Sequence, residues 1–335
     1  MSTSMRRHGS QEGPPFDSKS VGGQATPSRW KVRRLSVAAA GLVLGTAFAT
    51  AALADTPAPA SAAVALPPNG PVVTRVDAWT NLDLVNPKSV TAYCRGGTKL
   101  IGTGFSRTGG GAGVMIDEAV PTVGQIGADD RVKVTAYQTP AGAPFAWSLR
   151  AWAFCASGVS NVQVVYDESD FDTTAPKTAE AECLFGTKVV GTAFEARGAS
   201  GEVVVTKIDP VPGSGVVNDK VVVKAHPDDN GITGSWSVRA YAFCATAPPG
   251  LEIVSNTRAS TGTSWTVAAD CTGTKVALGA GGYVSDAATG NVLLTSLASF
   301  ELVTGQQGAV MAATEDANGT NAAWDLTTKV ICANR

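Results

Sequence analysis

The sequence is poor in the residues on which most catalytic and metal sites depend. It has two histidines in 335 residues, and only His226 lies beyond residue 54. It has no Cys-x-x-Cys pair, which argues against a zinc site of the common type. It has no Gly-x-Ser-x-Gly motif, and a Ser-His-Asp triad would have to use His226. The run Pro-Asp-Asp-Asn-Gly follows His226 and predicts a hairpin turn, so we expect a structural role for this histidine and no cofactor.

Aromatic residues and helical periodicity are scarce as well. Aromatics make up 7% of the chain, and no stretch after residue 70 has the 3.6-residue periodicity of an amphipathic helix. The apolar residues are mostly alanine and valine, and 37 glycines favour turns and strands. With 26 acidic and 19 basic residues, positions 55–335 carry a net charge of −7. A chain without a basic stripe is a poor partner for nucleic acid.

The N-terminus has the features of an export signal. Basic residues precede the uncharged stretch Leu35–Ala54, which ends in the small-x-small pattern that signal peptidases cleave. Residues 1–54 are therefore interpreted as a signal peptide with a long basic n-region, and residues 55–70 as a Pro/Ala-rich linker. Residues 35–54 are also just long enough to span a bilayer, so the alternative is an uncleaved anchor on the outer face of the cell membrane. Both interpretations put the rest of the chain outside the cytoplasm.

Six cysteines mark three copies of one unit, each with an opening and a closing cysteine 61 residues apart. Equivalent cysteines of successive copies are 88 or 89 residues apart, which indicates an internal repeat. Gly-Thr-Lys follows each opening cysteine, and a tryptophan stands eight residues before each closing one. The cysteines are Cys94 and Cys155, Cys183 and Cys244, and Cys271 and Cys332. The repeats span 71–158, 159–247 and 248–335.

Hydrophobicity within a repeat alternates with a period of two, which is typical of β-strands. The sequence thus predicts an all-β fold of three homologous antiparallel β repeats. Only five or six residues link a closing cysteine to the next strand, which favours a compact pseudo-threefold β-prism over the alternative, three tandem small β-sandwiches. In the second repeat, strands are expected near 161–167, 178–183, 187–196, 202–208, 219–225 and 235–244.

The repeat allows two symmetric sets of disulfides. The cysteines can pair within each copy, or the closing cysteine of one copy can pair with the opening cysteine of the next and close a ring. We expect pairing within copies, because each unit then carries its own bridge. Closing a loop of about 60 residues contributes roughly 4 kcal/mol in the chain-entropy estimate.

The repeat edges resemble those of known secreted proteins. The pattern Cys…Gly-Thr-Lys-Val-x-Gly…Trp-x-Val-Arg-Ala-Tyr-Ala-Phe-Cys-Ala over residues 71–335 is similar to repeats in secreted actinobacterial proteins of unknown function. A looser likeness links the cysteine-edged repeats to the threefold β-prism of vitelline membrane outer layer proteins. The resemblance implies secretion and a β fold, and it implies no activity.

The closing strands carry the most informative side chains. Alternation puts Trp147 and Cys155 on one face, which we expect to be core. Aromatic rings beside an arginine on the other face could stack on sugar rings and hydrogen-bond their hydroxyls, or could be buried against a neighbouring copy. These candidate ligand-binding residues are Arg150, Trp152 and Phe154 in the first repeat and Arg239, Tyr241 and Phe243 in the second.

Acidic residues supply the remaining candidates. Paired carboxylates could hydrolyse glycosides, but adjacent acids on a strand point to opposite faces, and most pairs fall at predicted turns. The densest acidic run contains Asp167, Asp170 and Asp172 and is a weak candidate for Ca²⁺, since it lacks the EF-hand order. The acidic pairs are Asp117/Glu118, Asp129/Asp130, Asp228/Asp229 and Glu315/Asp316.

Together these features predict a secreted, non-enzymatic binding or structural protein, with extracellular polysaccharide or cell wall as the expected partner. Repeated weak sites suit multivalent contact. The alternatives are a secreted hydrolase that uses carboxylates from different copies, and an inhibitor or partner-binding module that uses the glycine-rich loop Gly109–Gly113. A deep, acidic hollow that breaks the repeat symmetry would favour the hydrolase.

Overall fold

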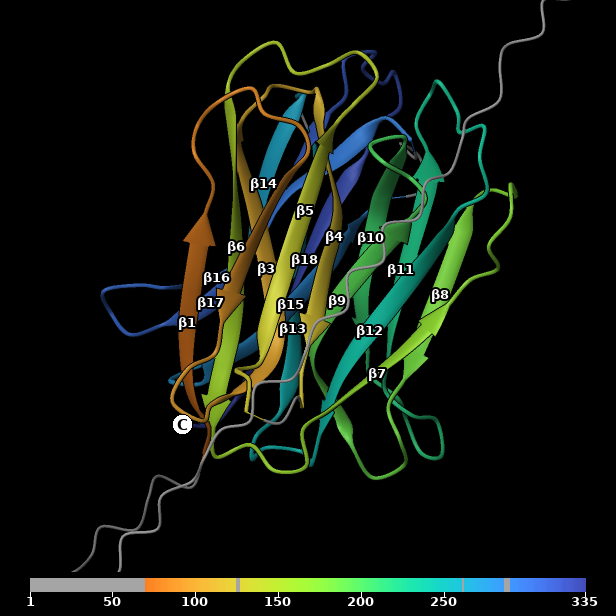
Figure 1. Cartoon of the computed structure of the whole chain (residues 1–335). Helices are drawn as coiled ribbons and strands as arrows, with labels where there is room; N and C mark the ends of the chain where they lie inside the picture. The colour runs from red at the N-terminus through yellow and green to blue at the C-terminus, as the bar shows by residue number, and fades with distance from the viewer. Residues whose placement is uncertain (1–69, 125–126, 261, 286–289) are drawn as a thin grey trace, which may run out of the picture. The chain divides into compact units, whose positions relative to one another are not determined.

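The regular secondary structure of the described residues consists of β-strands, in which buried and exposed side chains tend to alternate. The computed structural model describes residues 70–124, 127–260, 262–285 and 290–335, and within these ranges it contains strands and no helix. Strand β8 (Lys177–Glu182) is a clear example, because Lys177, Ala179 and Ala181 are buried while the residues between them are exposed. The expected all-β fold of antiparallel strands is thus confirmed (Figure 1).

Each repeat contributes six strands, and their bounds follow the sequence repeat. The first repeat forms β1 (Val72–Trp79), β2 (Lys88–Tyr93), β3 (Lys99–Gly109), β4 (Val114–Thr122), β5 (Arg131–Gln138) and β6 (Trp147–Ser157). The second forms β7 (Gln163–Glu168), β8, β9 (Lys188–Arg197), β10 (Val203–Val211), β11 (Lys220–Pro227) and β12 (Ser237–Ala245). The third forms β13 (Glu252–Ala259), β14 (Ser264–Asp270), β15 (Val276–Val284), β16 (Val292–Glu301), β17 (Gln307–Glu315) and β18 (Asp325–Ala333).

The strands form three six-stranded sheets, and each sheet takes three strands from one repeat and three from another. Sheet I has the order β1-β6-β3-β16-β17-β14, sheet II the order β2-β5-β4-β9-β12-β7, and sheet III the order β13-β18-β15-β10-β11-β8. Repeats one and three share sheet I, one and two share sheet II, and two and three share sheet III. This cyclic sharing agrees with the compact threefold arrangement and excludes three independent sandwiches in a row.

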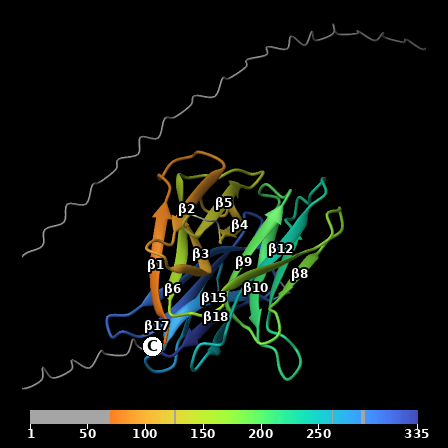
Figure 2. The ribbon, with the colours of Figure 1, turned by 60° about the horizontal axis from the view of Figure 1, so that its bottom comes forward.

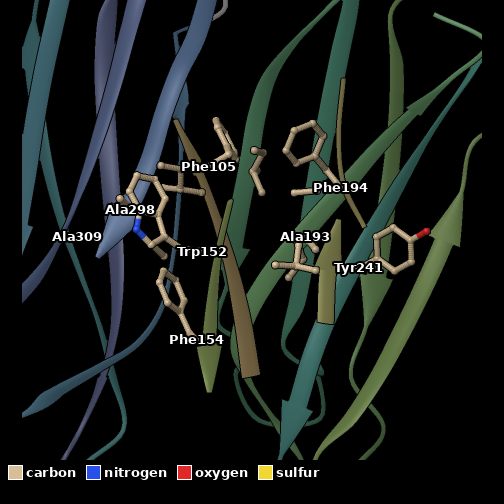
Figure 3. Packing of buried hydrophobic residues seen from close by; sticks show 14 of the residues in the cluster. Phe105, Trp152, Phe154, Ala193, Phe194, Tyr241, Ala298 and Ala309 are labelled. Atoms are coloured by element: carbon tan, nitrogen blue, oxygen red, sulfur yellow. The ribbon is translucent and has the colours of Figure 1, made fainter. Parts of the chain in front are cut away.

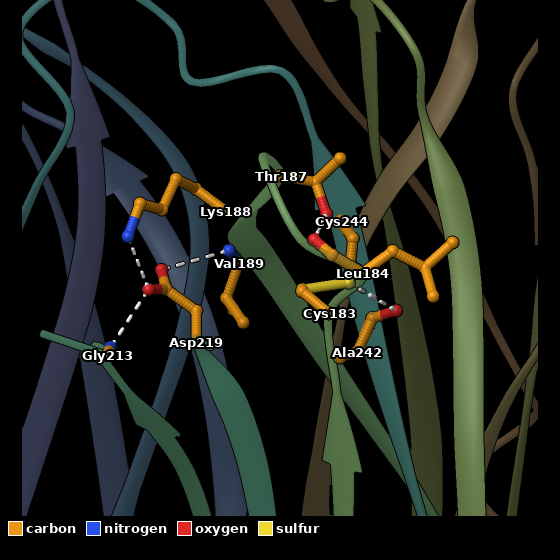
Figure 4. Close-up of a disulfide and its surroundings, with 9 residues drawn as sticks. All are labelled: Cys183, Leu184, Thr187, Lys188, Val189, Gly213, Asp219, Ala242 and Cys244. Carbon is orange, nitrogen blue, oxygen red and sulfur yellow. Dashed lines mark hydrogen bonds and ion pairs between the residues drawn. A yellow bond between two sulfur atoms is a disulfide. The ribbon is translucent and has the colours of Figure 1, made fainter. Parts of the chain in front are cut away.

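Disulfides join the two layers of every repeat. Cys183 follows β8 in sheet III, and its partner Cys244 lies on β12 in sheet II (Figure 4). The other two bonds, Cys94–Cys155 and Cys271–Cys332, occupy equivalent positions. Pairing within copies is therefore confirmed, and the alternative pairing between copies does not occur. Each bridge ties one sheet to another, which helps a small core built mainly from valine and alanine.

The third strands of the three repeats, β3, β9 and β15, contact one another where the sheets meet (Figure 2). Glycine makes this approach feasible. A β-carbon on Gly191 would lie 2.0 Å from the carbonyl oxygen of Ile101 and 2.7 Å from the α-carbon of Gly102. A β-carbon on Gly279 would lie 2.7 Å from the α-carbon of Gly191. Each repeat therefore places one glycine at the same central contact.

Large buried rings fill the core on either side of this contact. Trp147 at the start of β6 and Trp236 just before β12 are fully buried. The rings of Phe105 and Phe194 meet edge to face, with their centroids 5.5 Å apart (Figure 3). The third repeat has Gly282 at the equivalent position, and a β-carbon there would lie 2.8 Å from the sulfur of Met311. Methionine therefore occupies space that phenylalanine takes in the other two repeats.

The predicted signal peptide and most of the predicted linker, residues 1–69, lie outside the described residues. Three disulfides fit an extracellular protein, since such bonds persist in oxidising compartments. Within the described part of the chain, no helix has the length and apolar character needed to cross a bilayer.

Candidate functional site

The two faces of the closing strands β6 and β12 differ in what they contact. Trp147, Leu149 and Ala151 have no exposed surface and face the core of the repeat, as expected from alternation. On the opposite face, Phe154 and Phe243 are also buried, with 1% and 0% of their surface exposed. These two rings are packing residues that no ligand can reach. The ligand-binding hypothesis therefore depends on the arginines and on the remaining two rings.

On sheet I, Arg150 lies between two tryptophans. Its guanidinium carbon is 5.0 Å from the ring centroid of Trp152 and 5.5 Å from that of Trp79. Its Nε donates a hydrogen bond of 2.7 Å to Asp77. Trp152 is 7% exposed, whereas Trp79, at the end of the edge strand β1, is 68% exposed. Asp77, Trp79, Arg150 and Trp152 are called site I below.

On sheet II, the same chemical groups occur around Arg239. Its guanidinium carbon lies 4.9 Å from the ring of Tyr166 and 5.9 Å from that of Tyr241, and its Nη2 donates a bond of 2.6 Å to Glu168. The two tyrosine rings lie 5.8 Å apart. Tyr241 is 6% exposed, and Tyr166 on the edge strand β7 is 63% exposed. Tyr166, Glu168, Arg239 and Tyr241 are called site II.

The two sites contain the same kinds of residue, but at different positions of the edge strand. In sheet I, Trp79 pairs with Arg150 and Asp77 with Trp152. In sheet II the acid stands opposite the arginine, and the exposed ring stands opposite the buried ring. The acid and the exposed ring have therefore exchanged places along the edge strand. The third repeat has neither group, because its edge strand carries serine and threonine opposite Lys329 and Thr327.

Site II is held by a wider hydrogen-bond network. Glu195 on β9 accepts bonds from the hydroxyl of Tyr241 at 2.8 Å and from Arg239 at 3.0 Å. Burial opposes ionisation of Glu168, but bonds from Ser237 and two arginines outweigh it and lower the pKa to about 2. Burial, with the charge of Glu195, raises the pKa of Tyr241 to about 12. At neutral pH the site thus holds an ionised acid and a neutral phenol.

A polar hollow of about 210 Å³ adjoins site II. It is lined in part by Glu195, the residue to which Arg239 and Tyr241 of site II are bonded. Asp117 on β4 lies at its floor and is 2% exposed. One oxygen, Oδ2, accepts a bond of 3.0 Å from the N–H of Gly201, while Oδ1 is buried without a partner. Burial, opposed by this bond and assisted by the charge of Glu118, raises the pKa of Asp117 to about 8. The hollow is lined by Asp117, Glu118, Tyr137, Glu195, Ala196, Arg197, Gly198 and Ser200.

A β-bulge brings Asp117 and Glu118 to the same hollow. The pairing of β4 with β5 shifts register between Ile116 and Glu118, so Asp117 is the extra residue. Regular alternation would point these adjacent acids to opposite faces, as the sequence analysis assumed. The bulge recurs in the other repeats, where Thr206 and Thr295 are the extra residues. The acidic hollow is therefore specific to the junction of the first and second repeats.

In each of the other acidic pairs one aspartate accepts hydrogen bonds from the main chain, while Asp229 and Glu315 accept from side chains. Asp130 accepts bonds from the N–H groups of Leu100 and Gly124, and Asp228 accepts one from Asn230 in its own turn. Asp316 caps its turn in the same way. These pairs stabilise turns, a role that short acids often have. The loop that contains Gly109–Gly113 packs on Trp147 and Pro144.

The acidic run of the second repeat is engaged in local hydrogen bonds and an ion pair. Asp172 binds the buried ammonium of Lys177 at 2.5 Å, and the carbonyl oxygen of Asp170 accepts from the same group at 2.9 Å. Asp167 accepts a bond from the N–H of Glu180. No group of three metal-binding side chains is present among the residues that the structure describes.

Trp79 and Tyr166 were not identified from the sequence. Both lie on the first strand of a repeat, and their contact with the arginine depends on pairing between the first and the sixth strand. The alternation of each strand indicates which residues share a face, but it does not indicate which strand lies next to which.

No protein-family model matches the chain, and no curated protein matches it. The resemblance to secreted actinobacterial repeats and to vitelline membrane proteins therefore stays a prediction.

Proposed function

We propose that this protein is exported and acts as a non-enzymatic glycan-binding protein of the extracellular space or cell envelope, with sites I and II as its contacts. A signal-like N-terminus and three disulfides support export. An exposed indole or phenol can stack on the apolar face of a sugar ring, and an adjacent arginine–carboxylate pair can bind neighbouring hydroxyl groups.

One observation supports this proposal most strongly. Sites I and II contain the same kinds of chemical group, but they take the acid and the exposed ring from different positions of the repeat. Site I takes its exposed ring from Trp79 and site II from Tyr166, and these two residues are not equivalent in the repeat. Packing does not require either ring, because both are more than half exposed. The Arg150–Asp77 pair is partly exposed, and an exposed ion pair contributes only about 0–1 kcal/mol, so stability does not require this pair. The Arg239–Glu168 pair is more buried and also stabilises the fold. Ligand binding is a reason for both sites to keep the same groups.

Co-sedimentation with insoluble polysaccharides and purified cell wall tests the proposal. Wild-type protein should sediment with at least one polymer, and Trp79→Ala or Tyr166→Ala should each weaken this several-fold. The double variant should lose more than either single one, since linked weak sites gain avidity. Phe185→Ala is the matched control, because Phe185 is 86% exposed and belongs to neither site. Failure to sediment with any polymer, or equal loss in the control, contradicts the proposal.

A carboxylate-dependent hydrolase is the second candidate function, and the hollow at Asp117 is the observation that favours it. A carboxylic acid with a pKa of about 8 is protonated at neutral pH and could act as a general acid, with Glu118 or Glu195 as the second carboxylate. Incubation with the same polysaccharides should then release reducing ends, and Asp117→Asn should abolish the release. A polymer that is bound but never cleaved excludes this function for that polymer.

A further inference from the structure

Asp117 has one oxygen for which the described residues supply no partner. Its Oδ1 is shielded from solvent, and the side chain lies at the floor of the hollow beside site II. Buried polar atoms of folded proteins are almost always hydrogen-bonded, because each unpaired one costs free energy. The ionised form of a carboxyl only accepts hydrogen bonds, so a ligand group that donates one would satisfy this oxygen and favour ionisation.

The neighbouring carboxylates already have their counter-charges. Glu118 binds the ammonium of Lys133 at 2.8 Å and accepts a bond of 2.6 Å from Thr135. Glu195 is bound by Arg239 and Tyr241. Asp117 differs from both, since among the described residues its carboxyl is hydrogen-bonded only to the main-chain N–H of Gly201. A cationic donor is therefore the ligand group that this carboxyl lacks.

The bulge itself does not require an acid at this position. The second and third repeats make the same bulge with Thr206 and Thr295. Threonine keeps its hydroxyl near the backbone, as the contact of Thr206 with the carbonyl of Lys224 illustrates. Burial of a carboxyl group is unfavourable, so Asp117 should stabilise the fold less than a threonine at this position would.

Two observations narrow the chemistry of the ligand group. Among the described residues, no set of side chains here or elsewhere could hold a metal ion. The lining of the hollow carries three carboxyl groups, of Asp117, Glu118 and Glu195, against one guanidinium, of Arg197. A primary ammonium group fits both observations, because it is positive and carries three donors.

We infer that the hollow binds the ammonium group of an amino sugar, so that site II prefers glycans with free amines over neutral or N-acetylated ones. The inference rests on the proposed glycan-binding function. Glu195 connects the hollow to site II, because it lines the hollow and also accepts a hydrogen bond from the hydroxyl of Tyr241. Strands β7 and β4 are three places apart in sheet II, so several linked sugar rings would connect Tyr166 to Asp117.

Binding of an ammonium group should be coupled to proton release. The free carboxyl of Asp117 is largely protonated at pH 7, and an ammonium group favours its ionised form. Asp117 should therefore release a proton when it binds an ammonium group at pH 7, and the net release is this proton less any that an unprotonated amine of the ligand takes up. The charged and titratable groups that face Asp117 from β4, β5 and β9 are Glu118, Lys133, Tyr137, Glu195 and Arg197.

Calorimetry with two short glycans tests the inference. The probes are a tetramer of β-1,4-linked glucosamine and its fully N-acetylated counterpart, titrated into the full chain in buffers of different ionisation enthalpy. Wild type should bind the free amine at least about tenfold more tightly, the size of one charge-assisted hydrogen bond. Asp117→Asn should remove this preference and the proton release while leaving affinity for the N-acetylated tetramer unchanged.

Controls separate this inference from the proposed function. Glu182→Gln removes one exposed negative charge outside the hollow and should keep the preference, which excludes a simple effect of net charge. Asp117→Thr, which introduces the residue of the other repeats, gives a second test if the asparagine variant misfolds. Equal affinity of wild type for both tetramers overturns the inference and leaves glycan binding intact. Binding of neither tetramer nor any insoluble polymer overturns both.

Discussion

The hydroxyl of Thr192 donates a hydrogen bond of 2.6 Å to the main-chain carbonyl oxygen of Ala280, so the second repeat is bonded directly to the third. Thr103 makes the same bond to the carbonyl oxygen of Thr192, at 2.8 Å. Thr192→Val keeps the shape of the side chain and removes the donor, so we expect a loss of about 1–3 kcal/mol in the free energy of unfolding. Urea denaturation measures this loss. Thr178→Val on the exposed side of β8 is the control and should change stability by less than about 0.5 kcal/mol.

Gly191→Ala should be among the most destabilising single changes in the chain. Its β-carbon would meet the main chain of Ile101, which cannot move without shifting a central strand. Overpacking of a core costs about 1–3 kcal/mol, and a clash with backbone should reach or exceed the upper end. Gly234→Ala, where a β-carbon meets nothing, should be close to neutral. Similar midpoints of denaturation for the two variants would contradict the central glycine contact.

Removal of a disulfide should loosen two sheets at once. For Cys183→Ala combined with Cys244→Ala, the chain-entropy estimate for a loop of this length gives a loss of about 4 kcal/mol. Denaturation of the variant and the wild type under oxidising conditions measures it. Peptide mapping without reductant should recover a peptide that joins Cys183 to Cys244. A peptide that joins Cys155 to Cys183 would show that the pairing is wrong.

Asp117 should make stability depend on pH. Its pKa is about 8 in the folded state and near 3.8 in the unfolded state, so the folded state holds one more proton between these values. Stability from this group should therefore fall as pH rises, by up to about 1.4 kcal/mol per unit. Asp117→Asn should be more stable than wild type at pH 8, and the difference should shrink toward pH 5. Parallel stability curves would contradict this assignment.

Lys177 should control the ionisation of Asp172. A side-chain hydrogen bond from Lys177 is the largest influence, followed by bonds from Thr174, and together they lower the pKa of Asp172 to about 2. In Lys177→Met the pKa should rise toward its usual value near 3.8, as followed by carbon-detected NMR of the carboxyl group. Lys188→Met removes the partner of Asp219 instead and should leave Asp172 unchanged.

The sequence was sufficient for the repeat, the strands and the disulfides, because these depend on local alternation and cysteine spacing. In the second repeat every expected strand overlaps an observed one, from β7 to β12. It could not supply the cyclic exchange of strands, since period-two alternation defines faces and not neighbours.

The site was only partly predictable for the same reason. Arg150 and Arg239 were identified from the closing strands, but their exposed rings come from edge strands whose pairing is non-local. Phe154 and Phe243 alternate onto the expected face and are nevertheless covered. The hollow depends on a bulge that moves Asp117 by one position, and no local signal in the sequence marks it.

Cyclic sharing of sheets also determines when this chain can finish folding. Sheet I begins with β1, β6 and β3 but is completed by β16, β17 and β14, which are made last. A chain truncated before residue 248 would leave β3 and β10 as open sheet edges, and such edges recruit strands from other molecules. Two full-length but partly folded copies could therefore exchange their third repeats and complete each other's sheets by domain swapping. Folding that waits for the full length of the chain avoids this hazard.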